Sequence, residues 1–199
     1  MRLKNIFKIL LLITFAITSA NALKKDNLKE EMGNKINAIL LVLKDKNIQK
    51  DQKGEKIVEI IDSVFDYNTM SKIALGKKTW KSISKEKREE FVKVFERKLK
   101  NSYIGKLELY TDQQVKIIEL ITYKRTRLQL VTELLGEDDT YEINYNFYKN
   151  RKTNEWFIYD VDLIGVSIIQ TYRKQFSGLL KEKTFDEMLE TLKEANEKN

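Results

Sequence analysis

Carboxylates, amines and hydroxyls are the side chains of this chain that could do chemistry, because its 199 residues include no His and no Cys. Without imidazole or thiol groups, Ser-His-Asp hydrolysis, Cys-His proteolysis and the common zinc sites are excluded. The seven Gly are scattered, so neither a G-x-G-x-x-G fingerprint nor a P-loop is present. The 30 Asp and Glu leave carboxylate-pair chemistry as the remaining enzymatic possibility.

Asp160 and Asp162 are the carboxylates whose spacing invites a catalytic interpretation. Both alternate with apolar residues, so we expect them to face solvent or to pair with a nearby lysine. Two solvent-side acids have no apolar pocket that would raise the pKa of one of them, as a general acid requires. The sequence therefore predicts a protein that is not an enzyme, with no catalytic residue, metal or cofactor.

Positive charge is densest in one short stretch between two predicted helices. The stretch contains Lys77, Lys78, Lys81, Lys85, Lys87 and Arg88. A solvated surface is the ordinary interpretation of such a run. The alternative is an electrostatic docking patch for a partner or for anionic head groups, made by Lys77, Lys78, Lys81 and Arg88, where charge would mainly speed encounter.

The first 22 residues have the three parts of a secretory signal peptide. Arg2, Lys4 and Lys8 form a basic start, residues 9–17 are an apolar run, and Ala20-Asn21-Ala22 is an A-x-A cleavage pattern. A membrane anchor would need about 20 apolar residues, about twice the length of this run. We expect cleavage after Ala22 and export to the periplasm, and no Cys follows to accept a lipid anchor.

The remaining 177 residues are expected to form a single domain, residues 23–199. A chain of this size buries about 70% of its unfolded surface, enough for a core and an internal cavity. Its net charge falls from +7 to +4 without the basic residues of the signal, and the charges are interspersed. Nucleic-acid binders more often concentrate positive charge, so we expect no nucleic-acid partner.

The first half of this domain has the 3–4 residue period of amphipathic helices. The apolar positions predict helices over residues 28–43, 57–65 and 67–75, and a longer one from about 85 to near 110. Asp66 and Ser84 are the expected N-caps of the last two.

After residue 111 the period changes to two, which is typical of strands. Four strands are predicted, over residues 115–122, 126–135, 141–147 and 156–164, and polar turns separate the last three. Such successive short connections predict an antiparallel meander.

At Gly165 the pattern changes back to that of a helix. Gly165 permits a sharp turn, and Ser167 with Gln170 forms a capping box that opens a helix. A second box, Thr184 with Glu187, opens the last helix. The predicted fold is therefore α+β, with N-terminal helices, a curved four-stranded antiparallel sheet, and C-terminal helices packed on one face around an apolar cavity.

Several short motifs, in this order and spacing, resemble the MlaC family of periplasmic phospholipid-binding proteins, also called the toluene-tolerance auxiliary family. The motifs are Phe65-Asp66, Leu75-Gly76, Trp80-Lys81, Arg88-Glu89-x-Phe91, Tyr159-Asp160-Val161, Gly165-Val166-Ser167 and Tyr172-Arg173-x-Gln175-Phe176. The resemblance covers nearly all of the predicted domain. The Asp160-to-Ser167 signature is its most specific part.

This resemblance implies a monomeric carrier that holds phospholipid tails as cargo and needs no cofactor. Its partners would be the MCE-domain subunit of an inner-membrane ABC transporter and an outer-membrane lipoprotein–porin complex, and its task would be to maintain outer-membrane lipid asymmetry. The expected lipid-binding residues are Phe91, Phe95, Leu99, Tyr103, Tyr145, Phe147, Val161, Leu163, Val166 and Ile169. On periodicity alone, the helical and strand positions among them would be ordinary core.

Two other functions remain open at this stage. An exported protein-binding or scaffold module would have the same signal but a core filled by side chains. A carboxylate-based cell-wall hydrolase would need two inward carboxylates about 5–9 Å apart in a cleft.

Overall fold

Helices precede and follow the sheet, in the order that the sequence predicts. The computed structural model describes residues 23–107, 114–136 and 139–197, and the predicted signal peptide, residues 1–22, lies outside this range. The helices are α1 (Leu28–Lys44), α2 (Lys50–Ile61), α3 (Tyr67–Leu75), α4 (Lys77–Ser82), α5 (Lys85–Leu107), α6 (Ile168–Leu179) and α7 (Phe185–Glu197), with a 3-10 turn η1 (Asp62–Val64) after α2. The strands are β1 (Gln114–Lys124), β2 (Arg127–Leu135), β3 (Thr140–Lys149), β4 (Trp156–Leu163) and β5 (Val166–Ser167).

The strands pair in sequence order as an antiparallel meander, which confirms the predicted α+β class. The predicted strand number of four is wrong by one, because Val166 and Ser167 fold back on Leu163 and Asp162 as a two-residue fifth strand. Helix α4 was also not predicted. It is only six residues long and starts directly after Gly76, so it is too short to show an apolar stripe.

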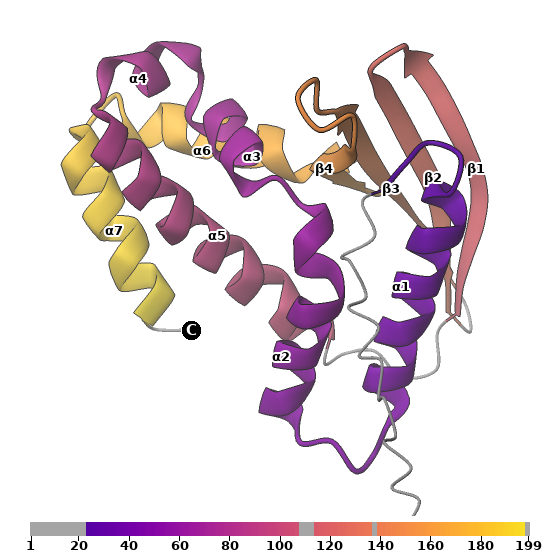
Figure 1. Cartoon of the computed structure of the whole chain (residues 1–199). Coiled ribbons are helices and arrows are strands. Elements are labelled where there is room, and N and C mark those ends of the chain that lie inside the picture. Colours follow the sequence, from indigo (N-terminus) through magenta and orange to yellow (C-terminus); the bar gives the residue numbers. More distant parts are fainter. Residues whose placement is uncertain (1–22, 108–113, 137–138, 198–199) are drawn as a thin grey trace, which may run out of the picture.

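The two faces of the sheet differ in chemistry. The inner face carries apolar side chains and is covered by helices, with α1 lying along β1 (Figure 1). The approach is close at Gly33 of α1, where an added Cβ atom would lie 3.3 Å from Ile117 Cδ1. On the other face a chain of hydrogen bonds joins Tyr123 to Gln129, Gln129 to Asn146, and Asn146 to Asp162 across four strands.

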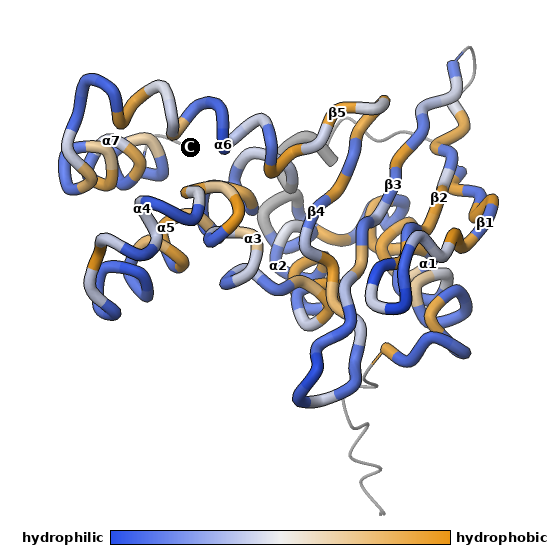
Figure 2. The backbone as a smooth tube through the Cα atoms, turned by 90° about the horizontal axis from the view of Figure 1, so that it is seen from above, coloured by the Kyte–Doolittle hydropathy of each residue, from blue (hydrophilic) through white to orange (hydrophobic). Residues whose placement is uncertain are grey.

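Two hydrophobic cores form, one within the helices and one between helices and sheet. The helical core centres on four aromatic rings of α5 and α6, Phe91, Phe95, Tyr172 and Phe176, with centroids 5.0–5.7 Å apart. The sheet core includes Leu28, Met32, Leu128, Leu130, Phe147, Trp156 and Ile158. Figure 2 shows the corresponding hydrophobic stretches of the strands, of α1 and of α2.

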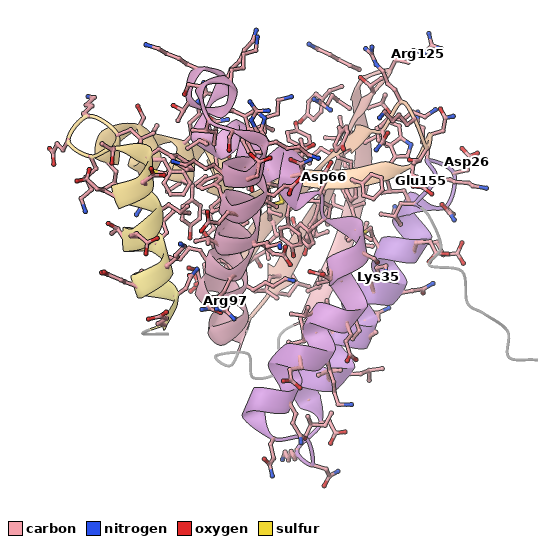
Figure 3. All side chains as sticks on the ribbon, turned by 60° about the vertical axis from the view of Figure 1, so that its left-hand side comes forward. Asp26, Lys35, Asp66, Arg97, Arg125 and Glu155 are labelled. Carbon is pink, nitrogen blue, oxygen red and sulfur yellow. The ribbon has the colours of Figure 1, made fainter. Side chains whose placement is uncertain are left out.

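Asp66 ties the helices to the sheet at the start of α3 (Figure 3). As predicted, it is the N-cap of this helix, and its side chain accepts hydrogen bonds from the Thr69 amide and hydroxyl at 2.9 and 2.7 Å. Tyr148 of β3 donates to the same carboxylate, and the Asp66 amide donates to the Ile158 carbonyl. The chain is therefore held at the point where it passes from one core to the other.

Asp160 is buried, and the expectation that it faces solvent is wrong. It is 7% exposed, because β5 and the first turn of α6 fold back over it. Its Oδ1 accepts from the amides of Val161 and Ile169 at 2.9 and 3.1 Å, and its Oδ2 accepts from the Ser167 hydroxyl at 2.5 Å. Ser167 in turn caps α6 by accepting from the Gln170 amide, as predicted. The Asp160-to-Ser167 signature thus joins strand to helix.

The turn between β4 and β5 contains a strained residue. Ile164 has a φ of +52° and Gly165 a φ of +73°, and β-branched residues are rarely found in this left-handed region. Gly165 tolerates the conformation, whereas Ile164 is strained in it. Ile164 is also 65% exposed, so little packing is gained in return.

Ile164→Asn should therefore raise the free energy of unfolding by about 1 kcal/mol, because asparagine adopts the left-handed conformation more readily. Urea denaturation followed by circular dichroism measures the change. The matched control is Val166→Asn, which removes a similarly exposed β-branched side chain from an ordinary backbone conformation. Equal effects of the two substitutions would mean that the turn stores no strain.

Candidate functional site: an apolar cavity

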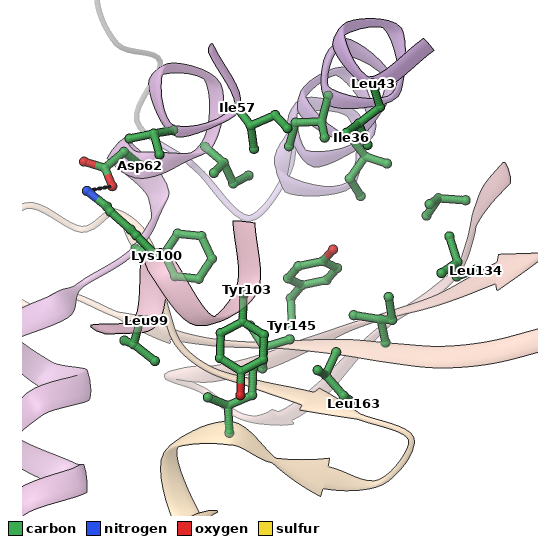
Figure 4. A pocket seen from close by; sticks show the side chains of 18 of the residues that line it. Ile36, Leu43, Ile57, Asp62, Leu99, Lys100, Tyr103, Leu134, Tyr145 and Leu163 are labelled. Atoms are coloured by element: carbon green, nitrogen blue, oxygen red, sulfur yellow. Dashed lines mark ion pairs between the residues drawn. The ribbon is translucent and has the colours of Figure 1, made fainter. Parts of the chain in front are cut away.

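A cavity of about 510 Å³ lies between the sheet and the helices α1, α2 and α5 (Figure 4). Helices α1 and α2 contribute Ile36, Ile39, Leu40, Leu43, Ile57, Val58 and Ile61 to its wall. The sheet contributes Val115, Leu134, Ile143, Tyr145, Val161 and Leu163, and most of the remainder comes from α3, α5 and the start of α6. Its size is within the range of about 300–1,000 Å³ of small-molecule pockets. The wall is suited to an apolar ligand.

Half of the predicted lipid-binding residues lie on this wall. Leu99 and Tyr103 reach it from α5, and Tyr145, Val161 and Leu163 reach it from the sheet. Burial raises the pKa of the Tyr145 hydroxyl to about 12, so this group stays neutral and can donate a hydrogen bond at any physiological pH. Whether these five residues bind lipid stays a prediction.

The structure places the other five away from the cavity. Phe91, Phe95 and Ile169 have no exposed surface and pack in the helical core, and Phe147 is enclosed in the sheet core. Val166 is 59% exposed at the turn before α6. In this structure these five residues therefore do not line the cavity: α6 and α7 pack against the N-terminal half of α5, and Val166 of β5 is exposed.

The helical hairpin α1–α2 was not predicted as part of the site, although it supplies a third of the wall. Its apolar stripes were recognised in the sequence and were used only to predict the helices. One feature of α1 indicates a binding surface, because its apolar stripe continues past the buried part of the helix. The buried residues are Leu28, Met32 and Ile36, and the stripe continues with Ile39, Leu40 and Leu43. Partly exposed apolar side chains at the end of such a stripe indicate a missing partner.

A small charged cluster interrupts the apolar wall at Asp62 and Lys100. Lys100 Nζ lies 2.7 Å from Asp62 Oδ1 and 2.6 Å from Glu96 Oε1, and the Tyr67 hydroxyl donates to Asp62 Oδ1 at 2.9 Å. Burial opposes the charge of Lys100, but the hydrogen bonds to Asp62 and Glu96 outweigh it and raise the pKa of Lys100. Burial and the hydrogen bond to Asp62 also raise the pKa of Tyr67. At neutral pH Lys100 is therefore charged and Tyr67 is neutral.

The predicted basic docking residues lie at the far end of the helices from the sheet, on or next to α4 (Figure 1). Lys77, Lys78 and Lys81 are exposed. Arg88 instead holds α4 against α5, since its Nε donates to the Trp80 carbonyl at 2.7 Å and its guanidinium lies over the Trp80 ring. Arg88 therefore contacts the chain itself, and whether the three exposed lysines dock a partner stays a prediction.

A model of the MlaC protein family matches residues 33–194, most of the chain. The chain belongs to the MlaC family. Among its relatives is the intermembrane phospholipid transport system binding protein MlaC of Haemophilus influenzae, which is 24% identical over 119 residues. That match covers 58% of this chain and 56% of the relative, so the chain spans about half the length of this MlaC protein.

A solved structure agrees with the architecture described above. It is the phospholipid-binding protein from Ralstonia solanacearum, determined in complex with a phospholipid. The match has a TM-score of 0.74 and covers 85% of this chain and 96% of that one, at 20% sequence identity. At this identity the likeness shows that the two chains share a fold.

Neither a metal site nor a membrane span is found in the part of the chain that the structure describes. The Asp and Glu residues of this part form no group of three or more that could hold a metal ion. No helix among the same residues is both long and apolar enough to cross a membrane.

Proposed function

We propose that this protein is a phospholipid-binding shuttle of the periplasm that holds acyl chains in the cavity between sheet and helices. The observation that carries the proposal is the cavity itself, which has about 510 Å³ of space and an almost entirely apolar wall. A soluble carrier must shield each methylene group from water, which is worth about 0.8 kcal/mol per CH₂. A wall of aliphatic and aromatic side chains provides this shielding without any catalytic group.

The alternative of an exported scaffold module with a filled core is less well supported, because the space that such a core would fill is open here. The hydrolase alternative is also less well supported, because Asp160 does not line the cavity and accepts structural hydrogen bonds from Val161, Ser167 and Ile169. The open cavity argues against the scaffold module and the bonded Asp160 argues against the hydrolase, so both observations favour a carrier.

The proposed route of the cargo lies between the MCE-domain subunit of an inner-membrane ABC transporter and an outer-membrane lipoprotein–porin complex. We propose that the protein travels as a monomer after cleavage behind Ala22, and that Lys77, Lys78 and Lys81 contribute to docking. These lysines belong to α4, none of whose residues lines the cavity, so a partner could bind them without covering the lipid. The net effect would be to maintain outer-membrane lipid asymmetry.

The test is to purify residues 23–199 from a Gram-negative periplasm without detergent and to count phospholipid per protein by mass spectrometry of the organic extract. About one phospholipid per protein is expected, because the proposed binding site is the cavity between sheet and helices. Transfer of a fluorescent phospholipid from donor to acceptor vesicles would then measure the shuttle activity. A protein that contains no lipid and takes none up from vesicles would overturn the proposal and leave the scaffold function.

A further inference from the structure

The cluster on the cavity wall consists of charged side chains, which apolar acyl chains do not need for binding. We infer that Asp62, Glu96 and Lys100 form a head-group site that prefers phospholipids with a primary ammonium, as in phosphatidylethanolamine. This inference rests on the proposed function, since it names the class of phospholipid that the same cavity would take. It is argued from the position, the charge and the open hydrogen-bonding positions of the cluster.

The position of the cluster suits a head group. Asp62 and Lys100 line the same cavity as the apolar side chains, yet their side chains are 39% and 23% exposed. Glu96 lies one helical turn before Lys100 on α5 and is 31% exposed. Because its side chains are partly exposed, the cluster lies where the cavity wall meets solvent, which is where an amphiphile with buried tails keeps its polar end.

The charge of the cluster is unbalanced. Two carboxylates, of Asp62 and Glu96, share the one ammonium of Lys100, so the cluster carries a net charge of −1. A partly desolvated excess charge is unfavourable unless a counter-charge approaches it. An incoming ammonium would supply that counter-charge, whereas an anionic head group would add to the excess.

The cluster also offers hydrogen-bond acceptors and a donor to which a head group could bind. Within the described part of the chain, both bonds to the Asp62 carboxylate end on Oδ1, and the bond to Glu96 ends on Oε1. Oδ2 of Asp62 and Oε2 of Glu96 can therefore each accept from a ligand. An ammonium has three N–H donors, and two of those of Lys100 are directed to carboxylates, so the third can donate to a phosphate oxygen.

Phosphoethanolamine matches both halves of this arrangement. Its phosphate can accept from Lys100, and its primary ammonium can donate to Asp62 and Glu96 as charge-assisted hydrogen bonds. A choline head group has the positive charge but no N–H donor, and a phosphoglycerol head group has no positive charge. The expected order of preference is therefore phosphatidylethanolamine, then phosphatidylcholine, then phosphatidylglycerol.

The test offers the protein vesicles with equal amounts of these three phospholipids, all with the same acyl chains, and quantifies the bound head groups by mass spectrometry. Phosphatidylethanolamine should be enriched about three- to fivefold over phosphatidylglycerol, the range typical of partly exposed ion pairs. Asp62→Asn keeps the shape of the side chain and removes its charge, so it should bring the enrichment close to one. Glu96→Gln should act in the same direction and replaces Asp62→Asn in the test if that variant does not fold.

A matched control exists on the same protein. Lys193 contacts Glu90 and Glu190 at 2.7 and 2.6 Å, a second cluster of one lysine and two carboxylates, on α5 and α7 and off the cavity wall. Glu90→Gln should leave the head-group ratio unchanged. Bound lipid in the same ratio as the vesicles, or enrichment that survives both Asp62→Asn and Glu96→Gln, would overturn the inference while the carrier function stands. No bound lipid at all would instead overturn the proposed function.

Discussion

Ile143→Glu is expected to reduce phospholipid binding at pH 7 by up to about 500-fold. Ile143 lies on the cavity wall and belongs to β3, the middle strand of the sheet, opposite Thr132 of β2 and Leu163 of β4. An acyl chain beside it would strip water from the new carboxylate, which must then be protonated before lipid can bind. Protonating a glutamate of pKa about 4.3 at pH 7 costs about 3.7 kcal/mol, which sets the size of the effect.

The same reasoning predicts how pH restores binding to this variant. At pH 5 protonation costs only about 1 kcal/mol, so the loss should shrink to about fivefold. Titration with a fluorescent phospholipid at the two pH values measures both affinities. Ile143→Gln, which is polar but uncharged, should bind with little dependence on pH.

Val166→Glu is the matched control for charge, because it adds the same carboxylate at an exposed position outside the cavity. It should bind lipid as the unmodified protein does. Circular dichroism of all three variants shows whether they are folded. Lipid binding by folded Ile143→Glu at pH 7 with undiminished affinity would mean that acyl chains do not occupy this cavity.

Asp160→Ala should lower the free energy of unfolding by about 3 kcal/mol, the largest stability effect expected here. The substitution removes the acceptor of the Val161 and Ile169 amides, and a buried donor without a partner costs about 1–3 kcal/mol. It also frees the Ser167 hydroxyl, which caps α6. Urea denaturation at pH 7 measures the loss.

Asp160→Asn separates hydrogen bonding from charge. Its Oδ1 can still accept from both amides, so it should cost less than about 1 kcal/mol at pH 7. Comparable losses in the alanine and asparagine variants would contradict the role assigned to Oδ1.

The stability of the unmodified protein and that of Asp160→Asn should also depend differently on pH. Burial raises the pKa of Asp160 above its ordinary value, although hydrogen bonds from Ser167 and Ile169 oppose the shift. The acid is then protonated more readily in the folded than in the unfolded state, and this contribution to stability is present below about pH 4 and is lost as the pH rises through the raised pKa. Asp160→Asn does not titrate, so its stability relative to the unmodified protein should improve over that rise.

Local signals in the sequence predicted much of the fold. The alternation of Tyr141, Ile143, Tyr145 and Phe147 predicted β3, and the structure confirms the caps at Asp66, Ser84, Ser167 and Thr184. These features depend on residues a few positions apart, so periodicity and capping chemistry suffice to find them. The two-residue strand β5 and the short helix α4 have too few residues to show a period.

The cavity wall could be predicted only in part, as α5 shows. One stripe on this helix contains Phe91, Phe95, Leu99 and Tyr103, yet the first two pack against α6 and α7 and the last two line the cavity. The difference depends on where other helices end, which is a long-range property. The exposure of Asp160 was predicted wrongly for a similar reason. Alternation along the strand indicates which face of the sheet Asp160 lies on, but it cannot reveal that β5 and α6 fold back over that position.

Among the described residues, the two hydrophobic cores share no fully buried side chain, and Phe65 and Ile168 pack against both. These two residues also line the cavity, which thus lies on the boundary between the cores. Units that touch through so little apolar surface can open separately, so the empty protein should unfold with low cooperativity. An acyl chain in the cavity would touch both units at once and couple them, because binding to the folded state alone adds to its stability. Cargo would then act as a removable part of the core, and each delivery of lipid would leave a looser protein behind.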